Sequence, residues 1–406
     1  MNPTALVTLL MVMIVAALAP IVSRVVPGRP PQVLFLILGG IVIGPHVMGS
    51  AETADVRLLA DLGLGFIFLL AGYELDPKML RERAGGQAVV AWVISAGLAV
   101  AVVGLLAAVG FVHAFVPVAI GLTTTALGTL LPILREQRML SGPFGRLIFA
   151  AGAAGELLPI LAISLFLGAY KTWWEALIIA SIAGFAFVLA LVIRLAARTR
   201  VAQIVLENSH DTSQATLRIT VVLLVGLLLV TQQFGVEAAL GAFFAGMVLR
   251  RASSNAERHA FDDKLDAVGY GVFIPVFFIS SGMSLDVVSI VQNPLRLLVF
   301  FVLLLVVRGV PALLVYRNTL SLRERFEAVL LTATALPLLV ALAEIGLDSG
   351  VMLEENAAAL VGAGVLSVAV FPLLAITMRK RRVAATAATQ PAGQVADSGQ
   401  PITVIE

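Results

Sequence analysis

Cysteine is absent from this chain of 406 residues. Disulfide bonds, thiolate metal sites and thiol nucleophiles are therefore excluded. The four histidines, at positions 46, 113, 210 and 259, are scattered, and no H-E-x-x-H zinc motif occurs. The sequence thus predicts neither an enzyme nor a resident cofactor.

Charge is also scarce, because only 13% of the residues are charged and 60% are hydrophobic. The mean hydropathy is +1.02. Ordinary soluble domains have roughly 45–50% apolar and about 25% charged residues. A protein this apolar could not cover its own surface in water, so lipid is the predicted solvent. A signal peptide would require Lys or Arg before its apolar stretch, but none precedes Arg24. The first apolar stretch is therefore predicted to be a retained membrane helix.

Thirteen segments are long and apolar enough to be predicted as membrane-spanning helices of an all-α protein. They cover residues 4–22, 31–49, 58–75, 87–112, 114–134, 144–169, 173–193, 215–233, 236–249, 266–282, 294–316, 326–346 and 357–378. Together they predict one membrane domain over residues 1–382, with a hydrophilic linker at about 194–214. The polar remainder, 383–406, is predicted to be a disordered cytoplasmic tail.

Positive charge alternates between the two sides of this predicted bundle. Of the 27 Lys and Arg residues, 23 lie in or beside the odd-numbered loops and the C-terminal tail, and only Arg57, Lys171 and Arg296 lie in even-numbered loops. Cytoplasmic loops are the ones enriched in Lys and Arg. The N-terminus is therefore predicted to be outside and the C-terminus cytoplasmic.

An internal repeat is indicated by motifs that recur about 210 residues apart. F-x3-G-x2-L-D closes both the third and the tenth segment, at Phe68–Asp76 and Phe278–Asp286, and a G-x4-G pair occurs at Gly39 and again at Gly241. The third and tenth segments cross the membrane in opposite directions in the predicted topology. This pattern predicts inverted repeats over about 31–169 and 236–378, which in transporters place the substrate site near the midplane. A chance recurrence in Gly- and Leu-rich helices is the alternative.

Threonines cluster in the fifth and twelfth segments, at Thr123, Thr124, Thr125, Thr332 and Thr334, beside Gly or Pro. Such segments are predicted to be discontinuous helices that cross near the midplane, where unwound carbonyls and hydroxyls meet a ligand. The alternative is that each hydroxyl bonds only to its own helix.

Two charges fall in the middle of predicted helices, Glu156 in the sixth and Arg308 in the eleventh. Charges at this depth are costly and indicate function by default. Burial favours the neutral form of a carboxyl group, and a nearby guanidinium favours its charged form. Glu156 could then hold either a proton or a hard monovalent cation, and this competition is the basis of antiport. A structural ion pair is the alternative, and the residues do not distinguish Na+ from K+.

Four stretches resemble the monovalent cation:proton antiporter-2 family, the Kef-type Na+/H+ and K+/H+ exchangers, over about residues 5–380. They are Leu59–Asp76, Gly121–Glu136, Leu240–Gly246 and Phe277–Asp286. The resemblance implies an antiporter fold with two crossing helices, elevator-type alternating access, a homodimer, and a bacterial cytoplasmic membrane location. It also implies that Glu156 is the proton and cation site and that Arg308 is its basic neighbour.

Gly155 departs from that family, because many members have Asp, Asn or Gln before the ion-binding acid. A single intramembrane carboxylate predicts electroneutral exchange of one proton for one cation. No glycine-rich nucleotide motif follows the last helix, so no nucleotide-binding domain is expected on this chain, and no nucleic-acid partner either. A gated cation pathway and an organic-anion porter on the same fold stay open as alternatives.

Overall fold

The computed structural model describes residues 3–26, 30–45, 47–74, 82–136, 139, 142–166, 181, 184, 215–233, 238–252 and 258–389. All regular elements within these ranges are helical. The predicted seventh segment, 173–193, and the linker at 194–214 lie outside the described residues except for positions 181 and 184. The count of thirteen helices therefore stays a prediction.

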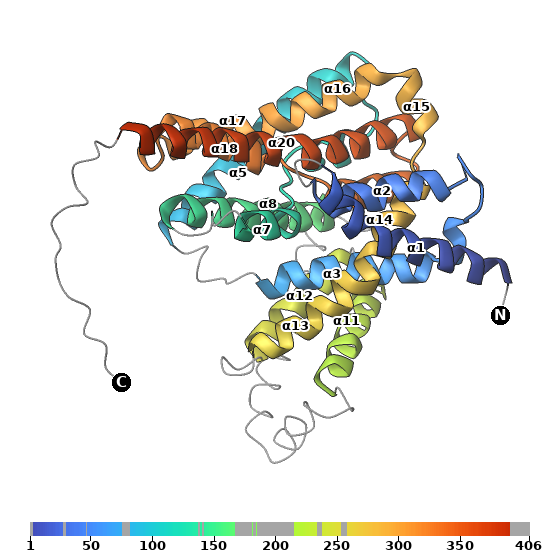
Figure 1. Ribbon diagram of the computed structural model, residues 1–406. Coiled ribbons are helices and arrows are strands. Elements are labelled where there is room, and N and C mark those ends of the chain that lie inside the picture. Colours follow the sequence, from blue (N-terminus) through green and yellow to red (C-terminus); the bar gives the residue numbers. More distant parts are fainter. Residues whose placement is uncertain are drawn as a thin grey trace, which may run out of the picture.

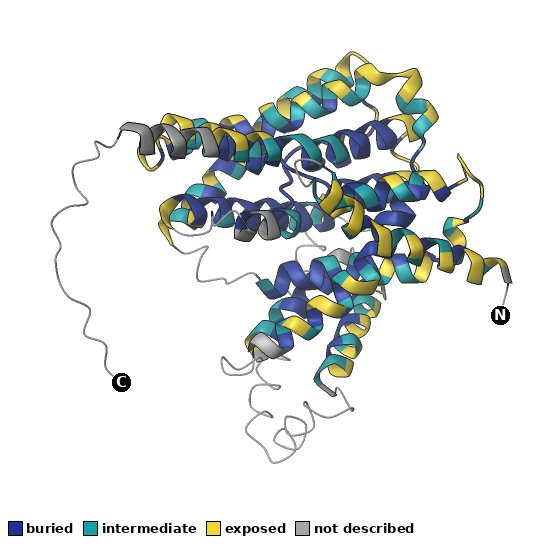
Figure 2. Cartoon of the chain, in the orientation of Figure 1, coloured by how far each residue is buried: buried dark blue, intermediate teal, exposed yellow. Residues whose placement is uncertain are grey.

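Seven of the described helical stretches are long and apolar enough to cross a membrane: Thr4–Val25, Arg83–Ala108, Gly142–Phe166, Phe261–Met283, Pro294–Asn318, Leu322–Leu347 and Glu354–Arg379. The exposed side of the first helix, α1 (Pro3–Val25), is apolar, as expected for a surface in contact with lipid. Leu6, Leu10, Ile14 and Leu18 recur every four residues along it, and each is more than 40% exposed. Such a stripe is suited to lipid, and Figure 2 shows exposed residues along the outward faces of the peripheral helices.

The helices form two groups, each of which packs together segments that are far apart in the sequence (Figure 1). The first group contains α1, α2 (Gln32–Ile43), α3 (Arg57–Glu74), α11 (Ala215–Gln233), α12 (Ala238–Ala252), α13 (Arg258–Val268), the π-helical turn η2 (Gly269–Phe273) and α14 (Ile274–Met283). The second contains α5 (Arg83–Ala108), α6 (Phe115–Gly121), α7 (Leu127–Glu136), α8 (Gly142–Phe166), α16 (Pro294–Leu303), the π-helical turn η3 (Leu304–Gly309), α17 (Val310–Val315), α18 (Leu322–Thr332), α19 (Pro337–Asp348) and α20 (Glu354–Thr389). Three short elements complete the described structure: η1 (Thr53–Asp55) between α2 and α3, α15 (Val287–Gln292) between α14 and α16, and η4 (Tyr316–Asn318) between α17 and α18.

Glycines let helices of the first group touch backbone to backbone. A Cβ atom placed on Gly72 of α3 would lie 2.0 Å from the carbonyl oxygen of Phe243 in α12, and one placed on Gly246 of α12 would lie 2.0 Å from a carbonyl oxygen of α3. The same reciprocal contact joins α2 to α14 through Gly40 and Gly282. Each of these distances is far inside van der Waals contact, so a side chain at any of the four positions would force the helices apart.

These contacts relate to the predicted repeat in a specific way. Gly72 and Gly282 are the glycines of the two F-x3-G motifs, and each packs against the helix that carries the other half's paired glycines. The two halves are therefore interlocked with each other. The inverted symmetry itself stays a prediction.

The helix boundaries differ from the hydropathy boundaries at charged ends. The tenth segment was predicted at 266–282, whereas continuous helix runs from Arg258 to Met283 through α13, η2 and α14. α20 likewise continues to Thr389, into the segment predicted as a disordered tail, and residues 390–406 lie outside the described residues. The apolar part of a spanning helix ends at the edge of the hydrocarbon layer, but the helix itself can continue through polar residues into the membrane–water interface.

Candidate ion site

Both predicted discontinuous helices are broken where their threonines lie. α6 ends at Gly121 and α7 begins at Leu127, whereas α18 ends at Thr332 and α19 begins at Pro337. The two breaks cross and bond to each other, because the Ala126 amide donates to the Thr334 carbonyl oxygen over 2.8 Å. The crossing thus satisfies backbone groups that neither broken helix can satisfy alone, as an apolar surrounding requires.

Of the five predicted threonines, only Thr125 uses its hydroxyl to join the broken helices. Its Oγ1 donates to the Thr332 carbonyl oxygen over 2.6 Å, and its backbone amide donates to the Gly155 carbonyl oxygen over 3.0 Å. The hydroxyls of the other four, Thr123, Thr124, Thr332 and Thr334, donate to carbonyl oxygens of their own helices. The alternative of local bonding therefore holds for those four side chains.

Arg308 is buried against this crossing, with 1% of its surface exposed. Its Nε donates to Thr125 Oγ1 over 2.8 Å, and its Nη2 donates to the Ala151 carbonyl oxygen in α8 over 2.8 Å. Glu156 is not among the partners of its guanidinium in the described structure. The guanidinium therefore joins η3, the α6–α7 break and α8, and the alternative of a structural ion pair with Glu156 is not formed.

Gly155 leaves the space that this arrangement needs. A Cβ placed on it would lie 2.5 Å from Thr125 Oγ1 and 2.8 Å from Arg308 Nη2. Any side chain here would displace the threonine or the guanidinium. The departure from the resembled family at this position thus has a steric cause in this chain.

Glu156 follows Gly155 in α8, and its side chain contacts the first turn of α7 rather than the Arg308 guanidinium. The Gly128 amide donates to its Oε1 over 3.3 Å, and its residue is 8% exposed. The N-terminus of a helix carries a partial positive charge and free amides, which stabilise a carboxylate in place of a counter-ion. The first turn of α7 therefore gives the Glu156 carboxyl group an amide donor, which would help to hold its charge when the proton leaves.

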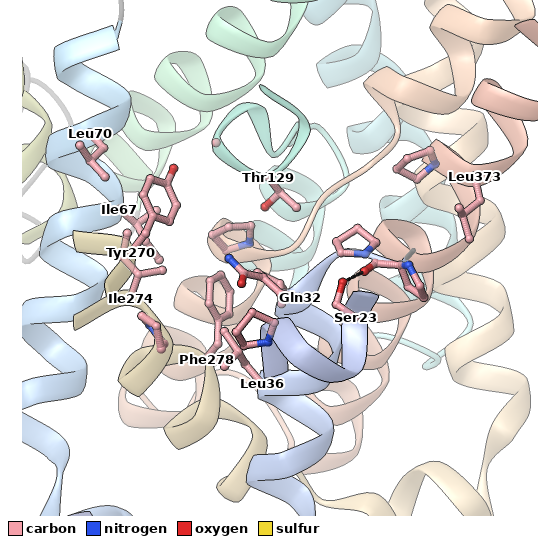
Figure 3. Close-up of a pocket in the computed structure, with 18 of the residues that line it drawn as sticks. Ser23, Gln32, Leu36, Ile67, Leu70, Thr129, Tyr270, Ile274, Phe278 and Leu373 are labelled. Carbon is pink, nitrogen blue, oxygen red and sulfur yellow. Dashed lines mark hydrogen bonds between the residues drawn. The ribbon is translucent and has the colours of Figure 1, made fainter. Parts of the chain in front are cut away.

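A cavity of about 1170 Å³ is in contact with Glu156. Gly128, Thr129 and Glu156 line it from the second helix group, whereas Ile67, Leu70, Glu74, Tyr270 and Phe278 line it from the first. It is also lined by the end of α1, the start of α2 and the middle of α20, including Ser23, Arg24, Gln32 and Thr377. Figure 3 shows Thr129 between Tyr270 on one side and Ser23 and Leu373 on the other.

Arg308 and the five threonines are not among the residues that line this cavity. The predicted site residues therefore divide in two. Glu156 is in contact with the cavity, and the others form the packed support behind it. Glu74, Thr129 and Tyr270 were missed as site residues, because nothing in their local sequence distinguishes them from other polar residues of apolar helices.

A profile of the transmembrane sodium/hydrogen exchanger family matches residues 12–377 of the chain. The chain belongs to the sodium/hydrogen exchanger family. The resemblance predicted from its motifs is thereby confirmed, and an exchanger-family chain with apolar spanning helices is a multi-pass membrane protein.

Several named proteins are similar to this exchanger-family chain. A putative Na(+)/H(+) antiporter, YjbQ of Bacillus subtilis, is 27% identical over 94% of the chain, and the glutathione-regulated potassium-efflux protein KefC of Salmonella schwarzengrund is 27% identical over 96%. The chain spans 64% and 63% of the lengths of these two relatives. Their names describe transporters rather than enzymes.

The fold of the exchanger-family chain is shared with a solved structure. The sodium proton antiporter MjNhaP1 of Methanocaldococcus jannaschii aligns with a TM-score of 0.61 at 15% identity, covering 95% of this chain and 98% of that one. Within the described residues, this likeness confirms the prediction of a sodium/proton antiporter fold with discontinuous helices.

Proposed function

We propose that the protein exchanges a monovalent cation, Na+ or K+, for protons, with Glu156 as the shared site. The observation that carries this proposal is the position of the carboxylate. It lies at the helix crossing, is held by the first turn of α7, and is in contact with a cavity. A carboxylate so placed binds either a proton or a hard cation but not both, so each ion leaves when the other binds. Family membership supports the same exchange.

The direction of the cavity supports an inward-open state. Its lining includes the end of α1 and the start of α2, where Arg24 lies in the last turn of α1 and Arg29 lies between the two helices in the sequence. Loops rich in Lys and Arg face the cytoplasm. The N-terminus is therefore outside and the C-terminus cytoplasmic in this proposal, in a bacterial cytoplasmic membrane. Figure 1 has the start of α1 and the end of α20 on opposite sides, as an odd number of crossings requires.

Elevator-type alternating access fits the two helix groups. The crossing helices and Glu156 belong to the second group, and the cavity lies between the groups. Movement of the second group past the first would carry the carboxylate to the other side. By family resemblance, the first group would be held still in a homodimer. A single carboxylate at the crossing makes exchange of one cation for one proton, and so electroneutral transport, the natural stoichiometry.

The organic-anion alternative is disfavoured by the position of Arg308. Recognition of a carboxylate substrate would need its guanidinium in the cavity, but both of its bonded nitrogens are turned to Thr125 and Ala151. A gated cation pathway is distinguished by coupling, because a conductive pathway moves charge and an electroneutral exchanger does not.

The test is proton flux in proteoliposomes with an internal pH dye, after pulses of Na+ or K+. Valinomycin with equal K+ on both sides holds the voltage at zero during Na+ pulses, and a membrane-permeant anion does so during K+ pulses; a protonophore is left out because it would dissipate the pH change itself. We expect cation-driven pH changes that persist at zero voltage and are absent from Glu156→Gln. Glu354→Gln, at the exposed start of α20, is the matched control and should behave as wild type. Exchange at the wild-type rate by Glu156→Gln would refute the assignment of Glu156 as the shared proton and cation site.

A further inference from the structure

Tyr270 brings a hydroxyl group to the ion site from the helix group opposite Glu156. The residue lies in η2 and lines the cavity, and Figure 3 shows its ring extending beside Ile67 and Leu70. A Cβ atom placed on Gly128 would lie 3.8 Å from the Tyr270 hydroxyl oxygen. Gly128 is the residue whose amide holds Glu156, so the phenol and the carboxylate flank the same turn of α7.

The π-helical turn and its packing hold the phenol in place. A π-turn inserts an extra residue into the helical ladder, which redirects the side chains within it, and such turns are frequent at functional sites. η2 is fixed against α3, because Phe273 stacks on Phe66 with ring centroids 4.9 Å apart and planes 6° apart. A Cβ on Gly63 of α3 would lie 2.2 Å from the Phe273 carbonyl oxygen, so the two backbones are in direct contact. The position of the Tyr270 hydroxyl group in the cavity is therefore fixed by the packing of η2 against α3.

The second π-turn of the described structure has a parallel role. η3 contains Arg308, whose guanidinium reaches the crossing from behind. Each π-turn thus delivers one long polar side chain to the α6–α7 break, Arg308 to the packed side and Tyr270 to the open side.

A hard monovalent cation takes several oxygen ligands, and one carboxylate cannot replace a hydration shell. Thr129 and Tyr270 both line the cavity beside Glu156 and carry hydroxyl oxygens. A phenol accepts and donates hydrogen bonds while neutral, so it can coordinate a cation without adding a charge that would retain it.

We propose that Tyr270 is a specificity-determining residue, whose hydroxyl oxygen completes the ligand set of the cation that occupies Glu156 from the cavity side. This inference rests on the proposed exchange function. Because Tyr270 belongs to the first helix group, it meets the cation only while α7 faces η2. It thereby sets cation affinity on the side to which this cavity opens.

The test compares Tyr270→Phe with Tyr316→Phe in proteoliposomes that present Na+ or K+ to the cavity side. Tyr316 is a matched control, since its buried hydroxyl has no hydrogen-bond partner in the described structure and it does not line the cavity. We expect Tyr270→Phe to raise the cation KM about threefold or more, the loss of one neutral oxygen contact, with the maximal rate within about twofold of wild type. The ratio of the KM values for Na+ and K+ should also change, and Tyr316→Phe should alter neither quantity.

Gly128→Ala provides a second variant that does not depend on the folding of Tyr270→Phe. Its methyl group would make ordinary van der Waals contact with the hydroxyl, so the fold is kept while the methyl group takes up space that a ligand of the hydroxyl would need. It should raise the KM in the same direction. An exchanging wild type whose KM values and ion ratio are unchanged in Tyr270→Phe and in Gly128→Ala would remove the role of Tyr270 alone. A wild type without cation-driven proton flux would overturn the proposed function and this inference with it.

Discussion

The substitution Thr125→Val tests whether the Thr125 hydroxyl group, unlike those of the neighbouring threonines, joins the two broken helices. Valine keeps the shape of threonine and removes the hydroxyl group. Thr125 Oγ1 accepts a bond from the buried Arg308 guanidinium and donates one to the Thr332 carbonyl oxygen. In soluble proteins a bond to a charged group contributes about 1.5–3 kcal/mol and a neutral bond about 0.5–1.5 kcal/mol. Interhelical bonds in membrane bundles average about 0.6 and reach about 1.7 kcal/mol. We therefore expect a loss of about 2 kcal/mol in the free energy of unfolding.

Thr124→Val is the matched control for this change. Thr124 is equally buried, but its hydroxyl donates only to the Gly121 carbonyl oxygen of its own helix. That carbonyl also accepts the Thr124 amide, so it keeps a partner when the hydroxyl is removed. The expected loss is within about 0.5 kcal/mol, as for substitutions that leave no buried group unpaired. Thr125→Ser keeps the hydroxyl and should lose only about 0.8 kcal/mol for its missing methyl group.

The assay is equilibrium unfolding of the purified variants in one detergent, monitored by circular dichroism. Comparing variants under identical conditions removes the contribution of the micelle. The order of stability should be wild type, Thr124→Val, Thr125→Ser and then Thr125→Val. Equal stability of Thr125→Val and Thr124→Val would refute the assignment of Thr125 as the link between the crossing helices and Arg308.

Three further variants test the surroundings of the site. Gly155→Ala should lower the unfolding free energy by about 1–3 kcal/mol, because the added methyl group overpacks the site. Gly97→Ala is its control, because Gly97 has open space around it in α5, and it should be neutral or stabilising by up to about 1 kcal/mol. Equal melting temperatures of the two variants would contradict this prediction. Arg308→Ala should lower the melting temperature and shift the pH profile of exchange without ending it, because the guanidinium supports the crossing and does not line the cavity; complete loss at every pH in folded protein would give it a direct role. Glu74→Gln should raise the cation KM at low ionic strength, and the difference should shrink as salt is added, because the cavity carboxylate attracts cations over distances that salt screens; a salt-independent effect would indicate direct binding instead.

The breaks in the crossing helices could be predicted because their cause is local. Threonines beside Gly121 and Pro337 weaken a helix wherever it lies, and the structure has both breaks at those places. Glu156 could be predicted for a similar reason, since a carboxylate in a long apolar helix is conspicuous on its own.

The distribution of roles within the site could not be predicted, because it depends on how distant elements meet. Thr123, Thr124 and Thr125 are equivalent in sequence, and only the crossing with α18 makes Thr125 different. A structural ion pair between Arg308 and Glu156 was the alternative that the sequence left open, but the small Gly155 leaves space for the guanidinium to bond to Thr125 instead. Tyr270 was missed because a π-turn leaves no trace in the hydrophobic period of a helix.

The interlocked glycine contacts have a consequence for biogenesis. The partner that Gly72 needs, at Phe243, emerges from the ribosome about 170 residues later. At about 5–20 residues per second, that delay is roughly 10–30 s. During this time α2 and α3 are inserted but cannot reach their final neighbours, so a chaperone or insertase has a defined interval in which to shield them. Expression of the first half alone should therefore yield a short-lived product, rescued when the second half is supplied as a separate chain.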